Sequence, residues 1–142
     1  MNGIAPACGW VFLALLLPGA GSEGDNAREA SAIARGLVDA ARKTYEAYEK
    51  DFYEGRGIQE NVYRWSRRWL KAQVAIAKSE RERVTAAEAH LARMTRLEKM
   101  ARKRLDARVA PLQEYTAASY YRLRAEDVLR KTRQEKAKDG PD

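Results

Sequence analysis

The sequence predicts an all-α protein, and three observations lead to that prediction. Apolar residues recur at three- and four-residue steps in four successive segments, which is the period of one face of an α-helix. Only 4 of the 142 residues are prolines, and none interrupts the periodic stretches. No stretch of strand length alternates apolar and polar residues between turn signals, so we expect no sheet. A chain of this length is expected to form one domain.

Residues 1–22 resemble a secretory signal peptide. The apolar run at residues 10–17 is followed by Pro18 and by small residues up to Ser22, which is the order of an apolar segment and a cleavage zone. The run is shorter than the roughly 20 residues that span a membrane. Because only the amino terminus is charged before it, an uncleaved membrane anchor is the alternative. We expect export to the periplasm or the outer membrane, and cleavage of the leader stays open.

The first helix is predicted over residues 26–54, where alanine and charged helix formers dominate. Asp25 or Asn26 can cap its start. Gly55 can take the left-handed conformation that ends a helix, and Gly57 gives the turn a second permissive position. The predicted core stripe consists of Ile33, Leu37, Ala41, Tyr45 or Thr44, Tyr48 and Phe52.

The second helix is predicted to begin near Ile58. Trp65 and Trp69 are expected to be core anchors in a bundle built mostly from alanine, and stacking on a ligand or a base is the alternative. The stripe consists of Ile58, Val62, Trp65, Trp69, Ala72 and Ile76, widened by Tyr63, Leu70 and Val74.

The third helix is predicted over residues 80–107. Ser79 and Glu82 have the spacing of a capping box at its start, although one continuous helix from residue 58 to residue 107 is the alternative. His90 is the only histidine of the chain, so we expect a surface or partly packed residue rather than a metal ligand. The stripe consists of Val84, Ala87, Leu91, Met94, Leu97, Ala101 and Leu105.

The fourth helix is predicted over residues 111–134, because Pro111 suits the first turn of a helix and disfavours helix in the residue before it. The polar residues 138–142 are expected to form a disordered tail. The stripe consists of Leu112, Tyr115, Ala118, Tyr121, Ala125 and Val128 or Leu129.

Two short matches suggest that the chain is a duplicated helical hairpin. The triplet at residues 54–56 (EGR) matches residues 106–108 (DAR) at a shift of 52, and residues 70–73 (LKAQ) match residues 123–126 (LRAE) at a shift of 53. Residues 23–137 are then expected to form one hairpin-repeat domain, an antiparallel up-down-up-down bundle of long helices. The breaks at residues 55–57 and 108–111 would lie at the same end.

Positive charge is densest between residues 93 and 108, which contain seven arginines and lysines and two acidic residues. The predicted basic face contains Arg93, Arg96 and Lys103. A solvated helix face explains such charge, because helices carry charges opposite their apolar stripe. The alternative is an anionic partner such as lipopolysaccharide or nucleic acid. Export argues against nucleic acid.

Residues 53–73 (YEGRGIQENVYRWSRRWLKAQ) resemble the repeated signature of TolC-like outer-membrane efflux proteins. In that family a helix ends at a Gly-containing tip, and the next helix continues from an apolar pair to a Leu-x-Ala-Gln/Glu element. The first copy matches at Tyr53, Gly55, Arg56, Val62, Tyr63, Leu70, Ala72 and Gln73. The second copy, with Ala107 in place of the glycine, matches at Leu105, Arg108, Leu112, Leu123, Ala125 and Glu126. The resemblance covers about residues 35–130.

The resemblance implies that the tips lie at the periplasmic end of a helical barrel and meet the adaptor protein of an efflux pump. The partner-binding residues that it implies are Gly55, Arg56, Gly57, Arg108 and Pro111. Family members that form a channel also contribute β-strands, each of about 9–11 alternating residues, and this sequence contains no such strand. It therefore resembles the helical periplasmic region without the pore.

The expected function is that of an exported, non-enzymatic helical module. It would act by contact with an adaptor-like protein or by self-association, in connection with efflux transport. The alternative is a basic helical protein that binds an anionic partner. An enzyme is not expected, because no nucleophile–base set and no Gly-rich phosphate loop occurs. No cofactor, metal site or small-molecule substrate is indicated, and association with a membrane stays open.

Overall fold

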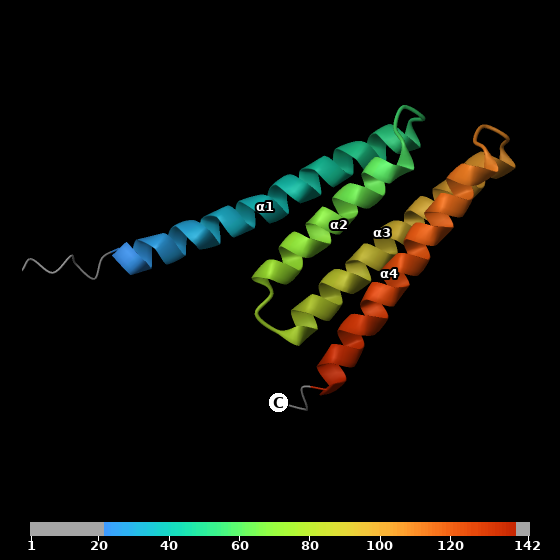
Figure 1. Ribbon diagram of the computed structural model, residues 1–142. Coiled ribbons are helices and arrows are strands. Elements are labelled where there is room, and N and C mark those ends of the chain that lie inside the picture. Colours follow the sequence, from blue (N-terminus) through green and yellow to red (C-terminus); the bar gives the residue numbers. More distant parts are fainter. Residues whose placement is uncertain (1–21, 139–142) are drawn as a thin grey trace, which may run out of the picture.

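The computed structural model describes residues 22–138, and every regular element in that range is an α-helix (Figure 1). The helices are α1 (Ser22–Tyr53), α2 (Gln59–Ile76), α3 (Glu80–Asp106) and α4 (Leu112–Lys138). The predicted all-α class is therefore confirmed. The predicted leader up to residue 21 and the predicted tail from residue 139 lie outside the described residues.

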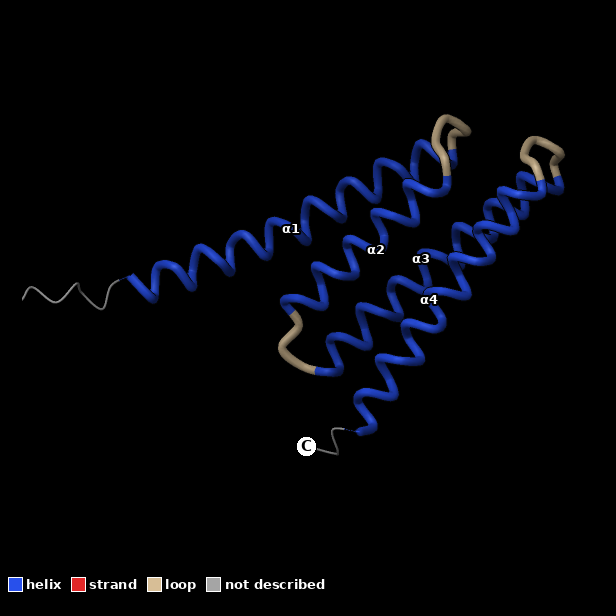
Figure 2. Tube along the Cα trace, in the orientation of Figure 1, coloured by secondary structure: helices blue, strands red, loops and turns tan. Residues whose placement is uncertain are grey.

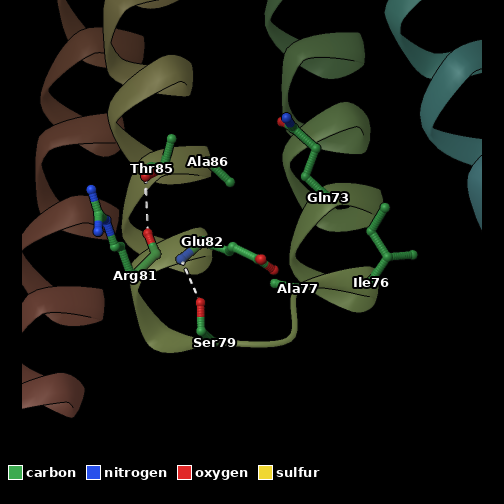
Figure 3. A pocket seen from close by; sticks show the side chains of 8 residues that line it. All are labelled: Gln73, Ile76, Ala77, Ser79, Arg81, Glu82, Thr85 and Ala86. Carbon is green, nitrogen blue, oxygen red and sulfur yellow. Dashed lines mark hydrogen bonds between the residues drawn. The ribbon is translucent and has the colours of Figure 1, made fainter.

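Helices α2 and α3 are separate, and the predicted cap at Ser79 divides them. The Ser79 Oγ accepts a hydrogen bond from the Glu82 backbone N–H at 3.2 Å, as the dashed line in Figure 3 shows. The Glu82 carboxylate in turn accepts one from the Lys78 backbone N–H at 2.6 Å. The first bond is that of a capping box, whereas the second comes from the residue before the N-cap and not from the N-cap residue itself.

The helices pack in chain order, α1 on α2, α2 on α3 and α3 on α4, with a smaller contact between α2 and α4. The loops of the α1–α2 and α3–α4 hairpins lie at one end of the molecule, and the α2–α3 connection lies at the other (Figure 2). The chain order of the helices therefore brings the two hairpin loops to the same end.

All four helices contribute to one core. Tyr63 of α2 stacks on Tyr121 of α4 with ring centres 4.0 Å apart and nearly parallel planes. Trp65 and Trp69 pack against this core but stay partly exposed. They therefore lie at the edge of the core and are not the fully buried anchors that the sequence predicted. The buried members of the core are Tyr45, Phe52, Val62, Met94, Leu97, Ala101, Ala118, Tyr121 and Ala125.

Several residues of the predicted stripes are exposed because they lie beyond the overlap of the helices. Helix α1 has 32 residues and α2 has 18, and the N-terminal part of α1 projects past its partner (Figure 1). Ile33 and Leu37 lie in the N-terminal half of α1 and are more than half exposed, so their prediction as core residues is wrong. Ile58 and Leu112 are exposed because they lie where the hairpin loops end.

Candidate functional site

The two hairpin loops form one paired end, and Arg104 of α3 joins them. Its guanidinium carbon lies 5.2 Å from the ring centre of Phe52, near the end of α1. Its Nε donates a hydrogen bond to Glu114 of α4 at 2.7 Å. A cation–π contact and a partly buried ion pair therefore hold the first loop against the second.

Both loops end their helices with the same pair of backbone hydrogen bonds, the Schellman motif. One bond closes six residues and the other closes four, which satisfies carbonyl groups that the helix leaves without partners. The N–H groups and their acceptors are Arg56 to Asp51 (2.9 Å), Gly55 to Phe52 (3.1 Å), Val109 to Arg104 (3.0 Å) and Arg108 to Leu105 (2.9 Å).

The left-handed residue of each motif corrects the alignment of the two copies. Gly55 has a φ of 77 degrees and Arg108 a φ of 58 degrees, so Arg108 rather than Ala107 occupies the place of the glycine. This correspondence is a shift of 53, the same as for the second match. Arg56 therefore corresponds to Val109, and the predicted equivalence of Arg56 with Arg108 is wrong, because backbone conformation rather than residue type defines the equivalent position.

The paired end exposes apolar side chains beside arginines, and we call this set the tip surface. Ile58, Val109 and Leu112 are 62%, 66% and 58% exposed. Exposed apolar residues that gather in one place mark interaction sites more often than scattered ones do. The tip surface consists of Tyr53, Arg56, Ile58, Arg108, Val109 and Leu112.

The remaining predicted tip residues shape the loops. A Cβ atom on Gly57 would lie 2.9 Å from the Phe52 backbone nitrogen, so a glycine is needed for close approach of the chain. Pro111 is exposed and directly precedes α4. Arg56 forms ion pairs with Asp51 at 3.1 Å and with Glu54, and these exposed pairs stabilise the fold little.

The predicted basic face of α3 is not one exposed surface. Arg93 is 4% exposed, so its prediction as a surface residue is wrong. It lies in line with the core residues Leu97 and Ala101, at four-residue steps. Arg96 donates to Glu49 of α1 at 3.3 Å, whereas Lys103 is exposed in the last turn of α3.

A buried polar cluster lies between α2 and α3, made of Ser66, His90 and Arg93. The Arg93 Nε donates to the Ser66 Oγ at 2.8 Å, and the Ser66 Oγ lies 2.8 Å from the His90 Nδ1. The serine oxygen accepts from Arg93, and its bond to the His90 Nδ1 takes either direction, according to which ring nitrogen carries the proton. The prediction of His90 as a surface or partly packed residue is wrong, since it is 2% exposed.

The surroundings of this cluster disfavour charge. Burial, with Arg93 and Arg67 nearby, lowers the pKa of His90 from 6.5 to about 4, so the imidazole is neutral at pH 7. Burial also lowers the pKa of Arg93 to about 10, so the guanidinium keeps its charge. It lies over the ring of Trp69 at 4.0 Å and near that of Tyr45 at 5.5 Å.

Two hollows lie beside the α2–α3 pair. The larger, about 510 Å³, opens at the connection between the helices, and its lining residues are labelled in Figure 3. The Glu82 carboxylate in it is engaged in the cap, and the Arg81 guanidinium points away from it (Figure 3). The second, about 310 Å³, is lined by Tyr45, Glu46, Glu49, Trp69, Ala89, Ala92, Arg93 and Arg96.

The cluster was not foreseen from the sequence, although a signal was present. Ser66 lies between Val62 and Leu70 at four-residue steps, and His90 precedes Met94 by the same step. A polar residue on the line of an apolar stripe is turned toward the core by helical geometry. The burial of Arg93 follows from the same rule, whereas its position over Trp69 could not be foreseen.

Comparison with protein-family models, with curated proteins and with solved structures finds no match for this chain. Within residues 22–138, no helix has both the length and the hydropathy needed to cross a bilayer. In the same part of the chain, no three His, Cys, Asp or Glu residues gather where they could hold a metal ion.

Proposed function

We propose that this protein is an exported helical module that binds a protein partner through its tip surface, in the manner of the periplasmic hairpins of TolC-like efflux proteins. The observation that carries the proposal is the exposure of Ile58, Val109 and Leu112 beside two arginines, on loops that Arg104 holds together. Apolar centres with arginines at the edge are typical of protein interfaces.

The repeated architecture supports the resemblance to that family. Both hairpins end in a Schellman motif, and the left-handed residues Gly55 and Arg108 are 53 positions apart, as are residues 70–73 and 123–126. An up-down-up-down arrangement of two hairpins with paired tips is the geometry that the family resemblance implies. The partner in this proposal is an adaptor-like protein, and the setting is the periplasm or the outer membrane.

The test compares binding of a candidate adaptor by the wild type and by charge-reversed variants. We expect Arg56→Glu with Arg108→Glu to weaken binding at least tenfold, because reversing an interface charge costs several kcal/mol. Melting should change little, since both residues are exposed. The matched control is Lys99→Glu with Lys103→Glu, two exposed lysines of α3. Arg96 is unsuitable as a control, because it pairs with Glu49.

The two variants distinguish a site on the tip surface from a site on the basic face of α3. Loss of binding in the tip variant alone supports the tip surface. Loss in the lysine variant alone would move the site to α3 and would favour the basic, anion-binding alternative. That alternative has less support, because Arg93 is buried and because Arg96, Arg102 and Arg104 are paired with acidic residues.

Self-association is a second candidate, and the projection of α1 favours it. Ile33 and Leu37 are exposed in the N-terminal half of α1, and the N-terminal part of this helix extends past α2 (Figure 1). They continue the stripe that α2 covers further along. In this candidate function a second copy of the chain packs on the projection, and the tip surface contacts no partner.

A further inference from the structure

Arg93 is a buried cation with incomplete compensation. Its Nε donates to the neutral Ser66 hydroxyl. No carboxylate of the described residues lies within ion-pair distance of its guanidinium. Its Nη2 is covered and donates to no acceptor within residues 22–138. The indole N–H of Trp69, whose ring lies 4.0 Å from the guanidinium, is also covered and without an acceptor there. Buried donors without partners and unpaired buried charge are both costly.

Both residues line the 310 Å³ hollow described above, which we call the Arg93 hollow. It lies where α1 and α3 flank α2. Ala89 and Ala92 leave it open on the α3 side, while Tyr45 and Trp69 supply aromatic walls. The other lining residues, Glu46, Glu49, Arg93 and Arg96, are charged. A hollow that combines aromatic walls with convergent polar groups can bind a small molecule.

We propose that the Arg93 hollow binds a small monocarboxylate with an aromatic or aliphatic body, whose carboxylate pairs with Arg93. An arginine and a carboxylate form paired, charge-assisted hydrogen bonds. Glu46 and Glu49 line the same hollow, and their charge repels phosphate and other multivalent anions more strongly than it repels a monocarboxylate. The aromatic walls and the alanines suit the apolar body of the ligand.

Entry of the carboxylate requires one wall to move, because both unpaired donors are covered. Tyr45 is held in place, since its hydroxyl donates to Glu49, which also pairs with Arg96. Trp69 is partly exposed, and its N–H has no acceptor that would be lost. The Trp69 side chain is therefore the one that turns, and its fluorescence reports binding.

The test is a titration with benzoate at constant ionic strength, followed by tryptophan fluorescence and by calorimetry. We expect saturable binding of one benzoate per chain. Benzamide, which has the same shape without the charge, and inorganic phosphate should each bind at least tenfold more weakly. Equal binding of benzamide or phosphate, or no saturable binding of benzoate, would overturn the proposal.

Two variants locate the site. Ala92→Leu fills the hollow with an equally good helix former, and it should weaken benzoate binding at least tenfold without lowering the melting midpoint. Ala40→Leu is its control, on an exposed position of α1 that lies outside the lining of the hollow. Unchanged binding by Ala92→Leu would place benzoate elsewhere and contradict the proposal.

Arg93→Met removes the charge but keeps much of the volume and leaves Ser66 bonded to His90. Binding should be lost while the melting midpoint stays the same or rises, because replacing a buried charge by an apolar side chain is often neutral or stabilising. Benzoate binding retained by Arg93→Met would overturn the proposal. Variants of the tip surface should bind benzoate as the wild type does. The proposal for the Arg93 hollow and the proposal for the tip surface can therefore be contradicted independently.

Discussion

Ser66 is hydrogen-bonded to both of its buried neighbours. Its hydroxyl accepts from Arg93 and lies 2.8 Å from the His90 Nδ1. It donates to Nδ1 when the neutral imidazole carries its proton on Nε2, and it accepts from Nδ1 in the other tautomer. A charged imidazolium would be buried and would lie close to two arginines. Burial and the two arginines therefore keep the histidine neutral at pH 7.

The first prediction concerns the pH dependence that follows from His90. Its pKa is lowered from 6.5 to about 4 on folding, so the unfolded chain binds the proton more tightly. Stability from this group is fully present above about pH 6.5 and is lost as the pH falls toward 4. The loss should be on the order of 2–3 kcal/mol in the free energy of unfolding.

Proton NMR of the imidazole measures this pKa directly, because the chain has 1 histidine. His90→Asn is the control, since its side-chain oxygen can still accept from Ser66. It should remove the pH dependence that belongs to the histidine and keep that of the carboxylates. An imidazole that titrates near pH 6.5 in the folded protein would show that the ring is hydrated.

At the scale of helices and loops, the sequence predicted the number of helices, the breaks between them and the cap at Ser79, whereas α1 begins four residues before the predicted start and α4 ends four residues after the predicted end. These depend on local signals: apolar period, glycine, proline and capping residues. The left-handed Arg108 was missed because that conformation usually requires glycine or asparagine. The exposure of Ile33 and Leu37 was missed because period fixes which face a residue is on, and not how far the neighbouring helix extends.

The equivalence of Gly55 and Arg108 gives the next prediction. A side chain in the left-handed region costs about 1–2 kcal/mol, and glycine costs up to about 1 kcal/mol through the entropy of the unfolded chain. Arg108→Gly should therefore raise the free energy of unfolding by up to about 1 kcal/mol. Gly55→Ala, the reverse change, should lower it by about 1 kcal/mol.

Urea unfolding of both variants measures these changes. Arg108 lies in the tip surface, so Arg108→Lys serves as a control that keeps the charge and the backbone preference. Its stability should match that of the wild type. The free energy of unfolding of Arg108→Gly could instead fall by about 1 kcal/mol or more. That result would mean that the Arg108 side chain makes contacts that outweigh its backbone strain.

At the scale of the whole molecule, the described residues form a packed region with exposed apolar side chains around it, and two of the exposed surfaces concern the proposed function. One surface is the tip, where the hairpin loops meet, and the other is the projection of α1 (Figure 1). The tip contains the residues that the family resemblance singled out, whereas the projection was expected to be core. The proposed function depends on the tip as the surface that meets another protein.

Photo-crosslinking in the cells that make the protein tests this claim most directly. A photoreactive amino acid is placed at Ile58 or Val109 in the tip surface, or at Leu37 on the α1 projection. We expect Ile58 and Val109 to crosslink to the same protein, a different chain from this one, and Leu37 not to reach it. Crosslinks from Leu37 alone, to a second copy of the chain, would contradict the tip account and support self-association.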